Sequence, residues 1–313
     1  MTVRPLEPTL ATFHNPLLRY AAATRPAFLT ASLMACMIGL AAAWHGGIAL
    51  SPELAAITLL FALLAHAGVN VLNDYYDALN GTDACNVERI FPFTGGSRFI
   101  QNSVLTLAQT RNFGFALLSG VALAGLWLML RSGAQLFYIG LAGLFIGWAY
   151  SAPPFRLNSR GLGELCVTAG FLLIAVGSDF VQRKGFSTAP LVAGLSYALL
   201  VANLLYINQF PDRKADMAAG KLHWVARLEV RQARWGYALI AALAYVWVLS
   251  SVMLGWLPLP ALLAVLALPL SIKAAQMLLR HAAQPQQLGG AIKLTIAAML
   301  MHGALLALGL ILG

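Results

Sequence analysis

Long stretches with few or no charged residues recur along the whole chain. They lie at about residues 27–50, 54–72, 113–130, 134–150, 165–182, 187–210, 235–255, 256–272 and 288–312. Most approach the roughly 20 apolar residues that an α-helix needs to cross the hydrocarbon core of a bilayer. Pro258 and Pro260 favour a short turn between the eighth stretch and the one before it. The pattern predicts an all-α integral membrane protein with nine transmembrane helices.

The composition agrees with a membrane protein of one domain. Of the 313 residues, 60% are hydrophobic and only 10% are charged, which is too apolar for a soluble core. The first apolar stretch follows a tail of residues 1–26 that contains Arg4, Arg19 and Arg25, and no cleavage pattern follows it. We therefore expect a retained first helix, a cytoplasmic tail 1–26 and a single transmembrane domain over 1–313.

The formal charge of +9 bears on the predicted orientation of the helices in the membrane. With the N-terminus in the cytoplasm, only Arg131, Arg183 and Lys184 of the 20 Lys and Arg residues lie on the far side, as the positive-inside rule predicts. Basic residues of this kind orient helices, so we expect no nucleic-acid partner. The two longest connections, about 73–112 and 211–234, then share the cytoplasmic face with most acidic residues, and function is expected there.

An Asn/Asp cluster continues the second predicted helix. On a helix, Asn70, Asp74 and Asp77 share one face, and Asn73 and Asp77 form an i, i+4 pair. Carboxylates so close together repel one another unless a cation lies between them. Carboxylate and amide oxygens suit Mg²⁺, which completes its shell with water and phosphate oxygens, and Asp83 can fold back toward the same ion.

A second cluster closes the sixth predicted helix. Asn208, Asp212 and Asp216 follow one another at i, i+4, i+8 spacing, so they stack along one side, and Pro211 is expected to kink this helix. Either cluster alone is compatible with a solvated helix end. Two such clusters at one membrane face instead predict a clamp that holds a diphosphate through two metal ions.

Two connecting segments offer further phosphate ligands. Residues 93–98 form a Gly-Gly turn followed by Ser97 and Arg98, a weak signal that also fits a plain flexible loop. Arg156 follows two prolines and is favoured as a ligand, whereas Arg160 is equally compatible with an orienting charge. His66 stands four residues before Asn70, but a lone helical histidine is more often a buried hydrogen-bonded residue, so it is not assigned to the site.

Metal centres built on cysteine are not indicated. Cys36, Cys85 and Cys166 show no Cys-x-x-Cys spacing, and there is no histidine cluster at metal-ligand spacing. No Ser/His/Asp or Cys/His arrangement for covalent catalysis is present either.

Together these motifs resemble the UbiA superfamily of membrane prenyltransferases over nearly the whole chain. The resemblance rests on Arg25-Pro26, on Asn73-Asp74-Tyr75-Tyr76-Asp77 with Asp83, on Thr94–Arg98, on Tyr150–Arg156, and on Asn208-x-x-x-Asp212-x-x-x-Asp216 with Gly220-Lys221. The pieces are most similar to the branch that prenylates 1,4-dihydroxy-2-naphthoate in menaquinone synthesis. His223 and Glu229 depart from it, since that branch typically has Thr and Gly near these positions.

The resemblance implies a nine-helix bundle around a central cavity, with both Asp clusters at its cytoplasmic mouth and an opening toward lipid. By this resemblance Asn73, Asp74, Asp77, Asp83, Asp212 and Asp216 would hold Mg²⁺ and diphosphate. Arg25, Asn70, Asn73, Arg98, Arg156, Asn208 and Lys221 would bind substrate, and Tyr150 would stabilise an allylic cation by its ring face. Asp77, Asp212 and Tyr150 are the expected catalytic residues.

The expected reaction is Mg²⁺-dependent transfer of a polyprenyl group from polyprenyl diphosphate to an aromatic acceptor, in the bacterial inner membrane with the active site facing the cytoplasm. Ionisation of the allylic C–O bond is followed by capture of the cation by an aromatic carbon. Other acceptors, such as 4-hydroxybenzoate, homogentisate, a chlorophyllide or haem, remain open. A multi-pass transporter is a remote alternative, because its charged sites are expected near the bilayer midplane.

Overall fold

A computed structural model describes residues 6–313, so Arg4 of the predicted tail lies outside the described residues. Over this range the chain is helical and contains no strand. The helices are α1 (Pro16–Ala23), α2 (Pro26–His45), α3 (Pro52–Asn80), α4 (Thr82–Cys85), α5 (Leu107–Ser132), α6 (Leu136–Ser151), α7 (Gly163–Arg183), α8 (Ala189–Ala218), α9 (Trp224–Arg227), α10 (Val230–Met253), α11 (Leu268–His281) and α12 (Gly289–Leu312). Three 3₁₀ segments join them: η1 (Leu157–Arg160), η2 (Leu259–Ala267) and η3 (Pro285–Gln287).

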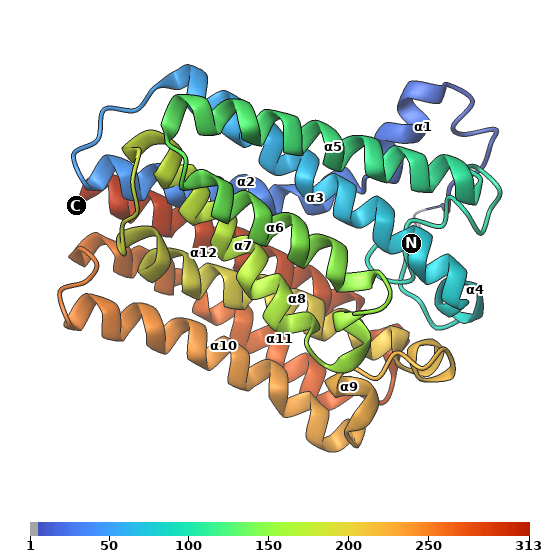
Figure 1. Cartoon of the computed structure of the whole chain (residues 1–313). Coiled ribbons are helices and arrows are strands. Elements are labelled where there is room, and N and C mark those ends of the chain that lie inside the picture. The colour runs from blue at the N-terminus through green and yellow to red at the C-terminus, as the bar shows by residue number, and fades with distance from the viewer. Residues whose placement is uncertain (1–5) are drawn as a thin grey trace.

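The long helices run side by side in one bundle, and the short helices α1, α4 and α9 gather at one of its ends (Figure 1). Eight of the helical segments, counting η2 and α11 as one, are long and apolar enough to cross a membrane. The remaining long helix, α6, is also apolar but has only 16 residues. The chain is therefore an integral membrane protein, while the predicted count of nine spans stays a prediction.

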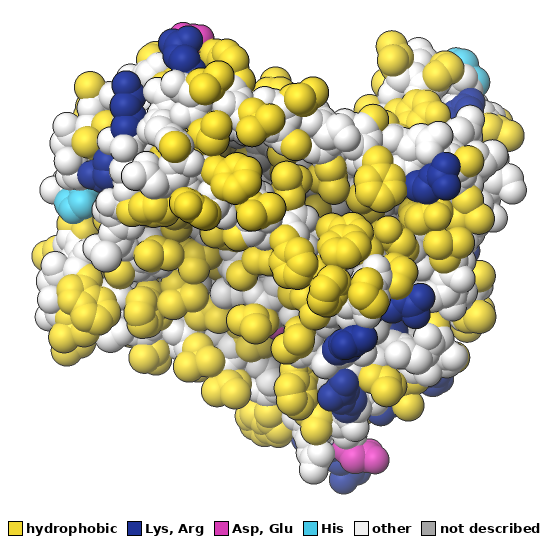
Figure 2. Space-filling model, in the orientation of Figure 1, with side chains coloured by type: hydrophobic (Ala, Val, Ile, Leu, Met, Phe, Trp, Pro, Cys, Tyr) yellow, Lys and Arg dark blue, Asp and Glu magenta, His cyan; other side chains and the backbone are white. Residues whose placement is uncertain are grey.

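The surface has the character expected of a bilayer-facing bundle. Figure 2 shows hydrophobic side chains over most of one face, with Lys and Arg side chains toward its edges. Exposed residues of this kind include Leu123, Leu130, Leu239 and Met253. In water so large an apolar surface would be unfavourable, whereas lipid tails solvate it.

Local signals in the sequence set the helix ends. Ser51 caps α3, its Oγ accepting from the backbone N–H of Leu54, and Pro52 occupies the first turn, where a missing N–H costs nothing. Thr106 and Gln109 form a reciprocal capping box at the start of α5. Gly81 ends α3 with a φ of 83°, a conformation that glycine adopts without strain.

Helix α8 lies at the centre of the bundle. It contacts α7, α10, α12 and α2 and is the most buried of the candidate spans, with 72% of its most apolar stretch inside the protein. Small residues let the surrounding helices approach closely: a Cβ on Gly39 of α2 would lie 2.1 Å from the carbonyl oxygen of Ala175 in α7. This packing fixes α8, and with it the second Asp cluster, relative to the other helices.

Two predicted helices extend further than their apolar stretches. The prediction of 54–72 becomes Pro52–Asn80, and that of 187–210 becomes Ala189–Ala218, with Pro211 inside the helix. Each Asp cluster is therefore part of the helix that precedes it, as the i, i+4 argument requires. The break expected near Pro258 is confirmed, since α10 ends at Met253 and the chain resumes a helical path at Leu259.

Candidate active site

A cavity of about 680 Å³ lies between α2, α3, α5, α6, α7 and α8. Its inner walls are mainly Leu, Val, Ile, Ala and Gly side chains from α5, α6 and α7. At one end its lining changes to four carboxylates, Asp77, Asp83, Asp212 and Asp216, and one ammonium group, Lys221. A long apolar space with a charged mouth suits an amphiphile with an anionic head.

Helix α3 contributes a row of polar side chains to this cavity. Asp77, Asn73 and Asn70 all line it. Asn73 donates to Oδ2 of Asp77 at 3.1 Å and to Oγ of Ser151 in α6 at 2.9 Å, whereas Asn70 donates to the carbonyl oxygen of Thr24 at 3.2 Å. The amide of Asn73 thus fixes the orientation of the carboxylate one turn further along.

Asp74, a predicted metal ligand, contacts the 93–98 loop. It is buried but does not line the cavity, and both of its oxygens accept from the backbone N–H of Ser97, at 3.3 and 3.2 Å. Its carboxylate holds the 93–98 loop against α3. In this geometry Asp74 supports the site, and its assignment as a metal ligand is not favoured.

The Gly-Gly turn is what allows Asp83 to approach the cavity. Gly95 and Gly96 have φ values of 78° and 72°, and a Cβ on Gly96 would lie 2.4 Å from Oδ2 of Asp83. Asp83 is 3% exposed and accepts from Gln101 at 3.4 Å. Burial raises the pKa of Asp83 well above its usual range, and the negative charges of Asp77 and Asp74 raise it further. A cation at the mouth would relieve this repulsion.

The second cluster faces the first across the mouth. Asp212 accepts from Asn86 at 2.6 Å and from the backbone N–H of Gly95 at 3.4 Å. Asp216 accepts from Nε2 of His223 at 2.9 Å, and its buried Oδ1 accepts no hydrogen bond within residues 6–313. Asn208 donates to the carbonyl oxygen of Phe93 at 3.4 Å and also lines the cavity.

Lys221 connects the two clusters. Its Nζ lies 3.0 Å from Oδ2 of Asp77 and 3.6 Å from Oδ1 of Asp216. Burial alone would lower the pKa of Lys221, but the carboxylates of Asp216 and Asp77 raise it well above its usual range. The side chain is therefore a cation at neutral pH and supplies the positive charge nearest to both Asp clusters.

The predicted arginines do not all reach the cavity. Arg25 lines it, donates to the carbonyl oxygen of Phe93 at 3.2 Å, and stacks over Phe28. Arg98 does not line the cavity: its buried guanidinium donates to the carbonyl oxygen of Asp83. Arg156 is exposed just before η1 and is likewise absent from the lining. Arg98 therefore shapes the loop that carries Asp83, and a direct phosphate contact by Arg156 finds no support in this arrangement.

The N-terminal segment braces the same loop from outside. Oε1 of Glu7 lies 2.6 Å from Nη2 of Arg89, and Oε2 accepts from Asn102 at 3.2 Å and lies 3.7 Å from Nε of Arg98. Burial would raise the pKa of Glu7, but the hydrogen bonds from Arg89 and Asn102 and the charges of Arg89 and Arg98 lower it overall. The segment before α1 is thus tied to the loop that carries the Gly-Gly turn.

Tyr150, in the last turn of α6, lines the cavity beside the charged mouth. Sequence reasoning missed Asn86, which holds Asp212, because nothing in a loop pattern reports a contact across 126 residues. It also left out His66, which lines the cavity one helical turn beyond Asn70. The i, i+4 spacing of His66 and Asn70 was the signal in the sequence that both side chains lie on the same face of α3.

The described residues fit a hard divalent cation that takes only part of its ligands from protein. No three His, Cys, Asp or Glu side chains between residues 6 and 313 are close enough, as they lie, to hold one metal ion by themselves. Mg²⁺, however, is commonly held by one or two carboxylates and completed by substrate phosphate oxygens and water. Carboxylate pairs on both sides of the mouth have this character, and the buried Oδ1 of Asp216 accepts no hydrogen bond within residues 6–313.

The chain matches the UbiA prenyltransferase family over residues 32–311. It is 28% identical to the 2-carboxy-1,4-naphthoquinone phytyltransferase of Synechocystis sp., over 97% of this chain and 96% of that one. It is 27% identical to the 1,4-dihydroxy-2-naphthoate octaprenyltransferase of Bacillus subtilis, over 92% and 90% of the two chains. Among solved structures, a UbiA homolog from Archaeoglobus fulgidus bound to DMAPP and Mg²⁺ has the same fold, with a TM-score of 0.62 at 15% identity over 92% of this chain and 99% of that one.

Proposed function

The chain belongs to the UbiA prenyltransferase family, and we propose that this membrane prenyltransferase transfers a polyprenyl group from polyprenyl diphosphate to 1,4-dihydroxy-2-naphthoate in menaquinone biosynthesis. One observation supports it most directly: four carboxylates and a lysine surround the mouth of an apolar cavity of about 680 Å³. The names of the Synechocystis and B. subtilis relatives, which both specify a naphthalene-derived acceptor, support the choice of acceptor.

The diphosphate group of the donor binds at the charged mouth. Asp77 and Asp83 on one side and Asp212 and Asp216 on the other are the residues that would hold Mg²⁺, with the amide of Asn73 beside them. Bound Mg²⁺ supplies positive charge that stabilises the leaving diphosphate. The use of Mg²⁺ is supported by the A. fulgidus homolog, whose structure contains it together with DMAPP.

The chain's own cations act on the same group. Lys221 lies against Asp77 and Asp216, and Arg25 lines the cavity. Both can approach the diphosphate and stabilise the negative charge that develops as the allylic C–O bond breaks. Preorganised charges of this kind need no rearrangement at the moment of reaction.

The remaining walls of the cavity stabilise the allylic cation and keep water away from it. Tyr150 lines the cavity next to Lys221, where its ring face can stabilise positive charge, and the apolar side chains beyond it exclude water. A C–C bond then forms between the allylic carbon and an electron-rich ring carbon of the acceptor. The diphosphate has by then left with the electrons of the broken C–O bond. The ring carbon finally loses CO₂ or a proton, which restores aromaticity.

The isoprenoid tail extends between α5 and α6. Leu126 of α5 and Leu141 of α6 line the cavity and are 48% and 54% exposed. We propose that the cavity opens toward lipid between these two helices, whose apolar side chains line it. We place α6 as a ninth span, with the charged mouth on the cytoplasmic side of a bacterial inner membrane, because this arrangement follows the distribution of Lys and Arg along the chain.

The test is a product assay with two acceptors in parallel. Purified protein in detergent is incubated with Mg²⁺, a polyprenyl diphosphate and either 1,4-dihydroxy-2-naphthoate or 4-hydroxybenzoate, and prenylated products are identified by mass spectrometry. Product from the naphthoate alone is the expected result. Product from 4-hydroxybenzoate alone would contradict the proposed acceptor, and a lack of Mg²⁺-dependent reaction with either would contradict both the acceptor and the role of the metal.

A further inference from the structure

The polar row on α3 continues beyond the residues of the diphosphate site. Asp77, Asn73 and Asn70 are followed, one turn further along, by His66, and all four line the cavity. Eleven residues separate Asp77 from His66 in the sequence, which corresponds to about 16 Å along a helix. This distance leaves room for a second group between the diphosphate and the imidazole.

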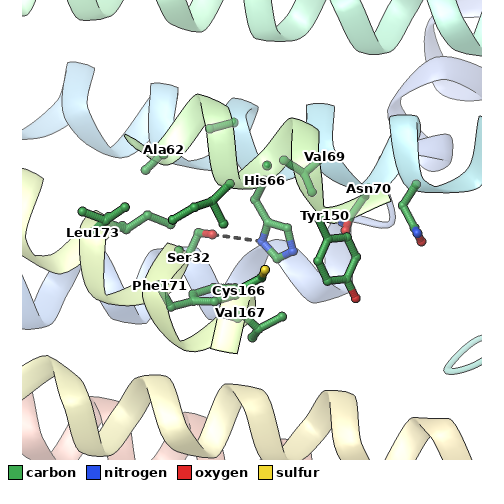
Figure 3. Close-up of a pocket in the computed structure, with 18 of the residues that line it drawn as sticks. Ser32, Ala62, His66, Val69, Asn70, Tyr150, Cys166, Val167, Phe171 and Leu173 are labelled. Atoms are coloured by element: carbon green, nitrogen blue, oxygen red, sulfur yellow. Dashed lines mark hydrogen bonds between the residues drawn. The ribbon is translucent and has the colours of Figure 1, made fainter. Parts of the chain in front are cut away.

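The imidazole of His66 is held in one orientation. Its Nδ1 lies 2.9 Å from Oγ of Ser32, a residue of α2 that is fully buried, and its ring meets the ring of Phe171 edge-on at 5.3 Å. Figure 3 shows the imidazole between Ser32 and Tyr150, with Cys166 and Phe171 beside it. Fixing Nδ1 in this way leaves Nε2 as the free nitrogen of the ring, and it makes no hydrogen bond within residues 6–313.

The surroundings of His66 are otherwise suited to a flat apolar ring. Val69, Val167 and Phe171 line the cavity around it, and Tyr150 adds a second aromatic side chain on the side toward the mouth. A polar nitrogen in such a setting costs free energy unless a partner satisfies it. The position thus combines one directional polar contact with aromatic walls.

We infer that His66, held by Ser32, binds a ring hydroxyl of the aromatic acceptor through Nε2, an inference that rests on the proposed prenyltransferase function. A phenolic hydroxyl both donates and accepts, so it pairs with either neutral tautomer of the imidazole. With the hydroxyl at His66 and the diphosphate at the Asp clusters, the acceptor ring lies between them, where the allylic carbon is released. His66 is then a substrate-binding residue that selects hydroxylated rings.

The experiment compares four variants with the wild-type protein. His66→Leu removes the polar contact, His66→Gln keeps a donor and an acceptor, and Ser32→Ala frees Nδ1. Thr58→Val is the matched control, because Thr58 lies on α3 and lines the same cavity two turns further from the mouth. For each protein the KM for 1,4-dihydroxy-2-naphthoate is measured, along with the Kd for a non-reactive prenyl thiodiphosphate in Mg²⁺ and the ligand-free melting temperature.

His66→Leu is expected to raise the acceptor KM by about tenfold, in line with the loss of one buried hydrogen bond, while the donor Kd changes by less than about twofold. His66→Gln recovers most of this loss, Ser32→Ala gives an intermediate value, and Thr58→Val matches the wild type. An unchanged acceptor KM in His66→Leu would overturn the inference.

Two further outcomes separate this inference from others. Equal losses in donor and acceptor binding, together with a lower ligand-free melting temperature, would assign His66 to helix packing alone and overturn the inference. Direct binding of 1,4-dihydroxy-2-naphthoate and 4-hydroxybenzoate is also measured by calorimetry. If the wild-type protein binds the donor but neither aromatic compound, both the acceptor proposal and the inference are overturned. If the wild-type protein binds 1,4-dihydroxy-2-naphthoate and His66→Leu binds it equally well, only the inference is overturned.

Discussion

The Nζ atom of Lys221 lies 3.0 Å from Oδ2 of Asp77, although 144 residues separate them in the chain. The contact joins the end of α3 to the segment after α8 and places one cation between the two Asp clusters. In the proposed reaction an incoming Mg²⁺–diphosphate complex would meet this lysine at the same carboxylates, so Lys221 would stabilise the mouth before the donor binds and the leaving group afterwards.

Replacing Lys221 by Met is expected to have opposite effects on metal binding and on turnover. Without the ammonium group the carboxylates repel one another more strongly, so Mg²⁺ alone should bind more tightly, as measured by calorimetry in the absence of donor. The kcat/KM for prenyl diphosphate should fall by roughly 30-fold or more, because a buried charge partner is lost. Lys214→Met is the control, since Lys214 is exposed and forms only a surface ion pair with Glu88. Weaker Mg²⁺ binding in Lys221→Met would contradict this account.

Asp212→Asn is expected to lower Mg²⁺-dependent turnover by about a hundredfold or more, because the position loses the charge that would hold the metal while keeping its shape. Asp179→Asn provides the comparison: Asp179 is more deeply buried than Asp212, at 1% exposed, and it pairs with Arg183 in α7 and does not line the cavity. That variant should lose stability and keep its turnover per folded molecule. Near-normal activity in Asp212→Asn would exclude a metal site shared by the two clusters.

Gly96→Ala is expected to displace Asp83. The new Cβ would lie 2.4 Å from Oδ2 of Asp83, so the carboxylate must move, and Mg²⁺-dependent activity should fall by more than about tenfold. Gly81→Ala carries a similar backbone strain, with a φ of 83°, but its Cβ would meet open space. It should cost about 1 kcal/mol of stability and little activity. Equal activity losses in the two variants would show that backbone strain, and not displacement of Asp83, is responsible.

Glu7→Gln tests whether the N-terminal segment braces the loop. Because the pKa of Glu7 is lowered in the folded protein, its carboxylate contributes stability above its unfolded pKa, and this contribution is lost as the pH falls through the lowered value. Wild-type protein should therefore melt a few degrees higher than Glu7→Gln at neutral pH, and the difference should disappear in acid. A difference that is independent of pH would mean that the charge of Glu7 contributes nothing.

The sequence alone predicted the bundle because apolar length and capping residues are local properties. It also predicted that Asn70, Asp74 and Asp77 share a face and that Asn73 and Asp77 form an i, i+4 pair, since their spacings follow the helix repeat. Asp74 accepts from Ser97 and does not line the cavity. The spacing along α3 could not predict this, because the position of the 93–98 loop decides which of the neighbouring side chains face the cavity.

Loop residues were harder to assign for the same reason. Arg98 carries the charge of a phosphate ligand, yet its guanidinium turns to the backbone of Asp83. Asn86 and Glu7 act through partners that lie far away in the chain, and no periodicity reports such contacts. The Asp clusters were visible because a helix repeats its geometry, whereas the loops that position them do not.

Helix α6, which lines the cavity beside the proposed opening toward lipid, is only 16 residues long. At 1.5 Å per residue it extends about 24 Å, several ångströms less than a hydrocarbon core of about 30 Å. An α6 that spans the bilayer creates a hydrophobic mismatch, which the membrane relieves by thinning locally. In the proposed arrangement the thinned lipid would lie where the isoprenoid tail enters, so the rate of donor uptake is expected to depend on bilayer thickness.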